Sequence, residues 1–183
     1  MPQATSATAL KYLGAKQYQL SMQGRFDPGW ICGLSHGLAE RKINIIRVEA
    51  ARGTGRHWQS RLELDFSLTA LAPELVDYLA LSRLPATVQA LTEPILLDDY
   101  QLERSTNYAG SLYLEASGPD RLGVLSSLLN TFSLFSLFPA EIRVETKSKR
   151  IFDRFWLKGM GGSTPSSEAV AAIRERMREF AQC

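Results

Sequence analysis

The sequence is poor in the residues that build disulfide or metal frameworks. Its 183 residues include two cysteines, Cys32 and Cys183, and two histidines. Two cysteines make neither a disulfide framework nor a zinc-binding pattern, and we read Cys32 as a small buried apolar residue. So little cysteine suits a reducing compartment, so we expect a cytoplasmic protein without a metal or a cofactor.

Long apolar runs and a strong charge of one sign are missing too. No apolar stretch reaches the roughly 18 residues that a membrane-spanning helix needs, and the N-terminus lacks the basic and apolar regions of a secretory signal. The formal net charge is +2 at pH 7, too near neutrality to indicate a nucleic-acid partner. We therefore expect no direct contact with nucleic acid or membrane.

Signs of catalysis are also absent from the sequence. It shows no nucleophile–base pair and no cofactor-binding loop, and Gly53-Thr-Gly55 is too short for a phosphate loop. We expect a protein that is not an enzyme. The apolar fraction of 45% is typical of globular proteins, and the length allows one domain or two small ones.

One stretch of the second half changes its hydrophobic period sharply. Residues 111–117 alternate like a strand, and apolar residues recur at helical spacing after Gly123. Gly118 to Gly123 is therefore a strand-to-helix turn that presents unpaired backbone N–H groups and the positive end of a helix dipole. Such a turn can hold a small anion such as an amino-acid carboxylate, or it can be a tight turn that binds nothing.

The same pattern occurs earlier in the chain. Residues 17–23 alternate like a strand, and Gly24 and Gly29 bracket a turn that leads into a helix. Gly118 and Gly123 follow these two glycines at a constant distance of 94 residues (118 − 24 = 94; 123 − 29 = 94).

This spacing continues beyond the helix. It places residues 141–143 on residues 47–49 without a gap, and Arg150 on Arg56. A repeat of this length indicates the duplication of a whole domain, because each copy is long enough for its own core.

Each copy continues with a strand, a hairpin, a second strand and a second helix. The strands are expected at residues 43–50, 57–66, 140–146 and 151–158, and the second helices are marked by Leu75, Tyr78, Leu79, Leu81, Leu84, Val170, Ile173, Met177 and Phe180. Residues 94–98 are a candidate fourth strand of the first copy, and residues 9–13 a candidate extra strand. The order βαββαβ predicts an α+β fold, with antiparallel sheets, both helices of a unit on one face, and the first strand beside the third.

The sequence divides on this basis into four parts. We expect a tail at 1–15, a first domain at 16–97, a linker at 98–110 and a second domain at 111–183. The second unit would then lack a last strand of its own, leaving the edge of its first strand bare. Because bare edges invite pairing, we expect the other domain, the tail or a second chain to cover it.

Two motifs resemble those of ACT domains, which are small amino-acid-binding regulatory modules. Asp120-Arg-Leu-Gly-Val-Leu125 resembles the family's Asp-Arg-Pro-Gly-Leu-Leu signature, and Ile151-Phe-Asp-Arg-Phe-Trp-Leu157 its third strand. The first copy is similar at Asp27-Pro-Gly-Trp30 and Asn44-Ile45. In length and layout the chain resembles tandem ACT proteins such as the repressor-like regulators of the glycine cleavage system, and each unit would be ferredoxin-like.

The resemblance implies a non-catalytic regulatory protein that binds an amino acid where two modules meet, near the first turn and the start of the second strand. It also implies a homodimer and a regulated protein partner. The ligand-binding residues that it implies are Asp27, Pro28, Gly29, Trp30, Asn44, Ile45, Asp120, Arg121, Leu122, Gly123 and Val124. The alternative is an oligomerisation or adaptor module, built from degenerate ACT domains, that binds no ligand.

The chain departs from the family pattern at several places. Phe26 stands where the family prefers Asp, Leu122 where it prefers Pro, and Phe138-Pro139 replaces the Asn-Ile pair in the second copy. The polar contact from that last position is lost. Trp30 is bulky, and such a residue is more often core or interface than ligand cover.

Two further features have a simple and a functional interpretation. The basic hairpins at 52–56 and 147–150 are either solvated turns or docking points for an acidic partner or a phosphate. Gly33 and Gly37, four residues apart on the first helix, either permit the close approach of a neighbouring element or are merely tolerated.

Overall fold

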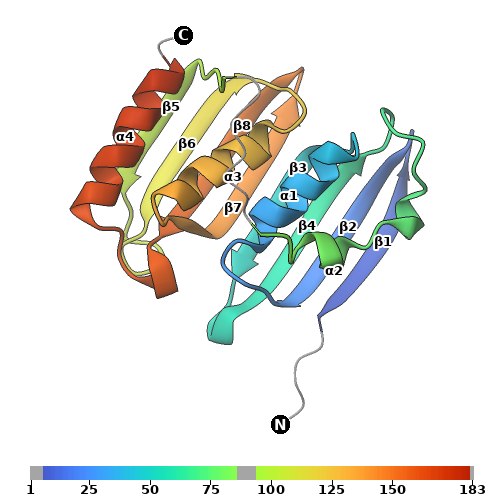
Figure 1. Ribbon diagram of the computed structural model, residues 1–183, viewed down its shortest axis with the longest axis horizontal. Coiled ribbons are helices and arrows are strands. Elements are labelled where there is room, and N and C mark those ends of the chain that lie inside the picture. The colour runs from blue at the N-terminus through green and yellow to red at the C-terminus, as the bar shows by residue number, and fades with distance from the viewer. Residues whose placement is uncertain (1–5, 86–93, 182–183) are drawn as a thin grey trace.

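The strands of the described residues lie in one continuous antiparallel sheet, where the sequence predicts one sheet for each unit. The computed structural model describes residues 6–85 and 94–181. Eight strands follow the order β1-β2-β4-β3-β7-β8-β6-β5, and the α-helices lie on one face of the sheet (Figure 1). The fold is therefore α+β with helices on one face, as the sequence predicts.

The two halves of the chain have the same sequence of elements. The first half contains β1 (Ala7–Gly14), β2 (Gln17–Arg25), α1 (Trp30–Glu40), β3 (Asn44–Arg52), β4 (His57–Asp65) and the short α2 (Tyr78–Leu81). The second contains β5 (Asp99–Arg104), β6 (Leu112–Pro119), α3 (Val124–Leu134), β7 (Phe138–Lys147), β8 (Arg150–Lys158) and α4 (Ser167–Ala181). Short 3₁₀ turns lie at Thr54–Arg56, Pro73–Leu75 and Met160–Gly162.

The spacing of the repeat agrees with these bounds. Helices α1 and α3 both have 11 residues, and both bounds of α3 follow those of α1 by 94 positions (124 − 30 = 94; 134 − 40 = 94). The first strand of each predicted unit lies beside the third, since β2 pairs with β4 and β6 with β8. The hairpins differ by one residue: Arg150 pairs with Pro119 as His57 pairs with Arg25, so Arg150 corresponds to His57 and not to Arg56.

The order of elements within each half differs from the expected βαββαβ. Each half reads ββαββα along the chain, because the strand expected last comes first. Residues 94–98, the candidate fourth strand, form no strand. The strand-like alternation of this segment arises because Ile95 and Leu97 are buried in the apolar core and their neighbours are exposed. The Leu97 amide donates to the carbonyl of Phe180 at the end of α4, not to a strand.

The segments expected as tail and linker both contribute strands to the sheet. β1 lies within residues 1–15 and pairs with β2, which confirms the candidate extra strand at residues 9–13. β5 lies within residues 98–110 and pairs with β6. The edge of β6 is thus covered, as edge strands require, but by β5 rather than by the other half, the tail or a second chain. The second half has four strands because β5, from the segment expected as a linker, takes the place of the last strand that the sequence does not provide after α4.

The halves join through a ladder between β3 and β7, which we call the seam. The pairing runs from Arg47 opposite Glu145 to Ala51 opposite Glu141. Glu49 lies opposite Arg143, and these two positions are equivalent by the 94-residue spacing, so an approximate twofold axis passes between them. Helices α1 and α3 lie against each other above the seam (Figure 1).

The core lies between the sheet and its helices. Alternate strand residues face it, as Leu20 and Met22 do in β2, and Cys32 is buried as expected. A Cβ on Gly33 would lie 2.6 Å from the carbonyl oxygen of Leu84, so the glycine does permit the chain at Leu84 to approach α1 closely. Among the described residues, no helix is both long and apolar enough to cross a membrane.

Candidate functional site

A pocket opens at one end of the seam, between the start of β3 and the β6–α3 turn. We call it the Asp120 pocket. It encloses about 350 Å³ of empty space, part of it open to solvent. The space between its walls is narrow and has room for only about one or two water molecules. Its lining comes from both halves of the chain: Ser35, Ala39, Ile43, Asn44, Ile45, Asp120, Arg121, Leu122, Gly123, Val124, Leu125, Ser126, Val144, Thr146, Ile151 and Asp153.

The β6–α3 turn forms one wall of this pocket and directs the start of α3 into it. Gly123 precedes the helix with φ +86°, a left-handed conformation that favours glycine. The carbonyl of Gly123 accepts the first helical hydrogen bond, from the Ser127 amide at 2.9 Å. The Val124 amide donates to the Arg121 carbonyl at 3.2 Å. The next two amides, of Leu125 and Ser126, have no carbonyl partner within the helix, and with the helix dipole they favour an anion there.

Asn44 of β3 and Asp120 of the β6–α3 turn line the pocket from the two halves of the chain. Burial raises the pKa of the Asp120 carboxyl, and the nearby Asn44 side chain and the Arg121 amide partly offset the shift. Arg121 itself donates to the carbonyl of Pro94. The pocket therefore combines an amide side chain and a half-buried carboxyl, the groups that bind an ammonium.

Asp153 of β8 lies at the inner side of the same pocket. Its side chain is 0% exposed, and neither carboxyl oxygen has a hydrogen-bond partner of ordinary geometry within the described residues. Burial first, and then the charge of Asp120, raise the pKa of Asp153 well above its usual range. A buried carboxyl without a partner is costly when charged, so burial favours the protonated form of Asp153.

The structure brings together seven of the eleven residues that the resemblance implies: Asn44, Ile45, Asp120, Arg121, Leu122, Gly123 and Val124. The others belong to the first half's turn, which lies at the opposite end of the seam. Pro28 lines a second pocket there, whereas Asp27, Gly29 and Trp30 line neither pocket. Trp30 is 1% exposed and stacks on Phe26, with ring centroids 4.9 Å apart, so it belongs to the core.

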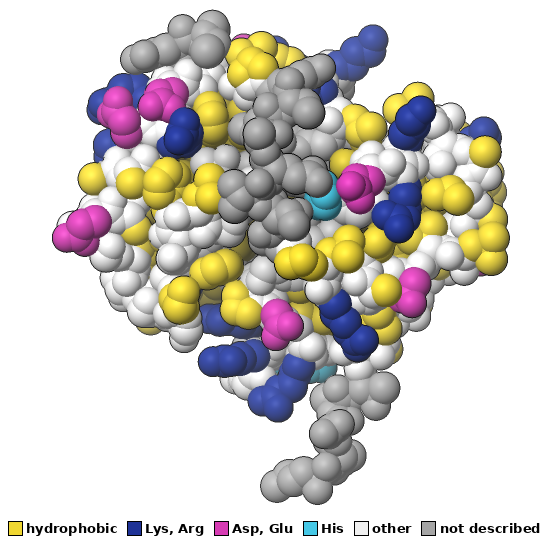
Figure 2. Space-filling view, viewed as in Figure 1, with side chains coloured by type: hydrophobic (Ala, Val, Ile, Leu, Met, Phe, Trp, Pro, Cys, Tyr) yellow, Lys and Arg dark blue, Asp and Glu magenta, His cyan; other side chains and the backbone are white. Residues whose placement is uncertain are grey.

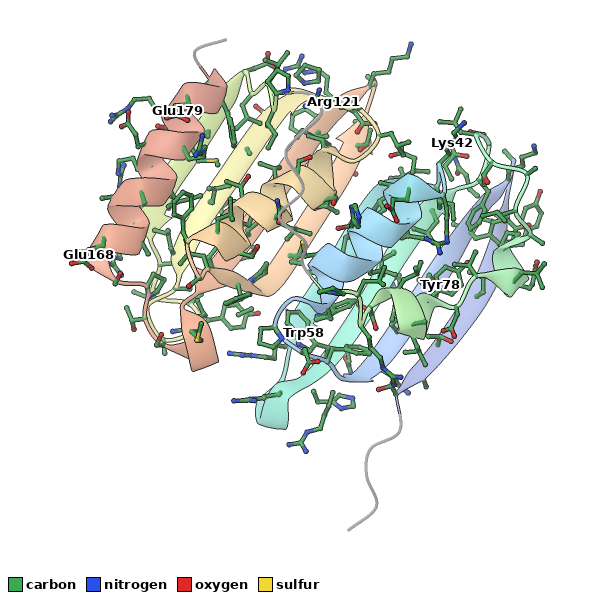
Figure 3. All side chains as sticks on the ribbon, viewed as in Figure 1. Lys42, Trp58, Tyr78, Arg121, Glu168 and Glu179 are labelled. Atoms are coloured by element: carbon green, nitrogen blue, oxygen red, sulfur yellow. The ribbon has the colours of Figure 1, made fainter. Side chains whose placement is uncertain are left out.

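The second pocket, which we call the Lys158 pocket, is related to the first by the approximate twofold axis. Its lining is Phe26, Pro28, Arg52, Arg56, Trp58, Phe138, Pro139, Lys158, Gly159, Gly161 and Gly162. Figure 3 labels Arg121 from the first pocket and Trp58 from the second, at opposite ends of the pair of helices α1 and α3.

Of the departures from the ACT pattern, Phe26 and Phe138-Pro139 line the Lys158 pocket, whereas Leu122 lines the Asp120 pocket. By the 94-residue spacing, Phe26 corresponds to Asp120 and Phe138 to Asn44. Two aromatic residues thus stand where the other pocket has its polar pair. Because each pocket takes its residues from both halves, one pocket keeps both polar groups and the other has lost both.

Reasoning from the sequence did not assign Asp153 or Thr146 to the site. The signal for Asp153 lay in its strand: the alternate residues Ile151, Phe155 and Leu157 are buried and apolar, and a carboxyl interrupts them. A charged residue in the inward-facing set of a strand indicates a partner or a pocket. The pairing of one half's turn with the other half's strand was not visible in either copy alone.

The Asp120 pocket has groups for both ends of a zwitterion. The first turn of α3 suits a carboxylate, and Asn44, Asp120 and Asp153 suit an ammonium. Within residues 6–85 and 94–181, no group of three or more His, Cys, Asp or Glu side chains is placed to hold a metal ion.

Comparisons of the chain with models of known protein families, with curated proteins and with solved structures find no match.

Proposed function

We propose that the protein is a non-catalytic regulator that binds a small amino acid in the Asp120 pocket and transmits the bound state to a protein partner. The observation that carries the proposal is the pocket itself, in which a polar pair from two halves faces the start of a helix. The ligand carboxylate would lie at the first turn of α3, and its ammonium between Asn44 and Asp120.

The proposal extends to the kind of domain. We propose that each half is an ACT-like, ferredoxin-like unit whose fourth strand has moved to its N-terminal end. The strand order β1-β2-β4-β3 in the first half and β5-β6-β8-β7 in the second supports this, because both halves keep a split βαβ arrangement. The seam would then correspond, within a single chain, to the contact that two separate modules make with each other.

The size of the pocket favours a small ligand such as glycine, alanine or serine. Because the empty pocket is narrow, even these must separate the Asn44 and Asp120 side chains, which now lie close together in it. Binding would therefore change how the two halves meet, which is the differential interaction that a regulatory switch requires.

Isothermal titration calorimetry with single amino acids tests the proposal. We expect glycine, alanine or serine to bind at micromolar to millimolar concentration, more tightly than leucine or phenylalanine. Asp120→Asn should weaken binding about 10- to 100-fold, because hydrogen bonds to charged groups contribute about 1.5–3 kcal/mol.

Asp27→Asn is the matched control for that variant. Asp27 is an exposed carboxylate in the equivalent turn of the first half, outside the pocket. Its substitution should leave affinity unchanged. The proposal fails if no amino acid gives a response at millimolar concentration, or if both variants weaken binding equally.

A second candidate is an oligomerisation or adaptor module without a ligand. Strand β1 is an edge of the sheet, and it exposes 60% of Tyr12 and 43% of Leu13. Exposed edges of this kind pair readily with other chains. Light scattering that shows a stable oligomer, unchanged by any amino acid, would favour this candidate over the sensor.

A further inference from the structure

The Lys158 pocket combines several cations with no carboxylate in its lining. Arg52 ends β3, Arg56 lies in the following turn and Lys158 ends β8. Figure 2 shows dark-blue basic side chains gathered at the lower edge of the molecule, where Figure 1 places the turn between β3 and β4. The charges come from two halves of the chain and meet because the seam brings the strand ends together.

Lys158 is unusual among these cations because its side chain is only 5% exposed. Its ammonium donates to the carbonyl of Ala109 at 3.0 Å, which uses one of its three donors. Burial first, and then the charge of Arg52, lower the pKa of Lys158. A buried cation normally has an anionic partner, and the described residues provide none here.

Arg52 is held close to Lys158 by the backbone of the β8–α4 turn. A Cβ added to Gly162 would lie 3.1 Å from Nη2 of Arg52, so glycine leaves room for the guanidinium against the chain. Gly161 and Gly162 have φ of +67° and +84°, which other residues adopt only with strain. Arg52 and Arg56 have no carboxylate in an ion pair among the residues that the structure describes.

The other walls of the pocket limit what can enter. Phe26, Phe138 and Pro139 form an apolar side, and the pocket encloses about 450 Å³ of empty space, part of it open to solvent. The nearby Glu141 is already engaged by Tyr108 and Arg143, so it does not neutralise the cations. Two or more converging cations match a dianion better than a single carboxylate.

We propose that the Lys158 pocket binds the phosphate group of a small molecule through Arg52, Arg56 and Lys158. This site is independent of the Asp120 pocket, which lies at the other end of the seam. The same twofold arrangement would thus hold two different ligands, because the polar pair of one pocket is replaced by aromatic residues and cations in the other.

Inorganic phosphate is the probe for the first test. We expect it to shift the amide NMR signals of residues 159–162 in a saturable manner at constant ionic strength, and acetate at the same concentration to leave them unchanged. Arg52→Gln should weaken phosphate binding at least 10-fold, and Lys158→Met likewise if that variant folds. Equal effects of phosphate and acetate, or no saturable shift, would overturn the proposal.

Lys149→Gln controls for net charge. Lys149 is an exposed residue of the hairpin between β7 and β8, in the other half of the repeat and outside the Lys158 pocket. The variant loses the same charge as Arg52→Gln, so its phosphate affinity should equal that of the unaltered protein. A loss equal to that of Arg52→Gln would show a general charge effect and reject the site.

Discussion

Asp153 places a carboxyl among apolar side chains on the helix-facing side of the sheet. Its neighbours in the ladder are Ala116 of β6 and Val144 of β7, and neither offers a side-chain donor. Asp120 lies close enough for its charge to raise the pKa of Asp153. The two carboxyls can therefore both ionise readily only when a cation, such as a ligand ammonium, lies between them.

We expect the stability of the unliganded protein to fall as the pH rises, in a manner that depends on Asp153. The pKa of this carboxyl is higher in the folded than in the unfolded chain. Its contribution to stability is thus fully present below the unfolded pKa of about 3.9 and is lost as the pH rises through the folded pKa. Asp153→Asn cannot ionise, so its melting temperature should exceed that of the unaltered protein increasingly from pH 5 to pH 8.

Asp27→Asn, which replaces an exposed carboxylate outside the pocket, serves again as the control in these melting curves. It should follow the unaltered protein at every pH. If Asp153→Asn gives a curve parallel to the unaltered protein across this range, Asp153 is not protonated in the folded state.

At the scale of elements, helices and inner strands were more predictable than edges. Residues 17–23 alternate because β2 lies inside the sheet with one face on the core. β1 and β5 are edge strands with mostly exposed residues, so neither carries the alternation that marks a half-buried strand. The sequence offered residues 9–13 as a candidate strand and residues 98–110 only as a linker, and the ladders with β2 and β6 show that both segments contain strands.

Helix α1 depends on two glycines for its contact with the segment around α2. We expect Gly33→Ala to lower the free energy of unfolding by about 1–3 kcal/mol, since a Cβ would lie 2.6 Å from the backbone oxygen of Leu84. Gly37→Ala should be milder, because its Cβ would meet the flexible Leu81 side chain at 2.7 Å. Both variants gain similar helix propensity, so their difference in urea denaturation isolates the clash. Equal stabilities would contradict this packing.

At the scale of the whole molecule, the seam joins β3 and β7, two strands that occupy equivalent positions in the repeat but differ in sequence. Glu49 and Arg143 occupy equivalent positions and lie opposite each other, and Arg47 of β3 forms an ion pair with Glu145 of β7 at 2.8 Å. Opposite charges directly across an antiparallel ladder are favourable. In a symmetric pair of identical chains, the Glu49 position would face its own like charge. This pairing is therefore suited to the two halves of one chain.

We expect Glu49→Arg to destabilise the protein by about 0.5 kcal/mol, because it places two arginines opposite each other at the seam. The double variant Glu49→Arg with Arg143→Glu restores opposite charges in reverse order. A double-mutant cycle in urea should therefore give a favourable coupling energy that shrinks at high salt. A coupling energy near zero at low salt would mean that these charges do not specify the seam.

The sequence by itself determined the class of fold, the duplication and the two turns, because hydrophobic period and glycine spacing are local properties of the chain. It also supplied seven of the 16 residues that line the Asp120 pocket, through the resemblance at residues 120–125 and 44–45. Only the tertiary structure decided which turn faces which strand, since that follows from the β3–β7 pairing across residues far apart in sequence. The β6–β8 ladder placed Asp153 near Asp120, and the β3–β7 pairing brought Arg52 and Lys158 together at the other end of the seam.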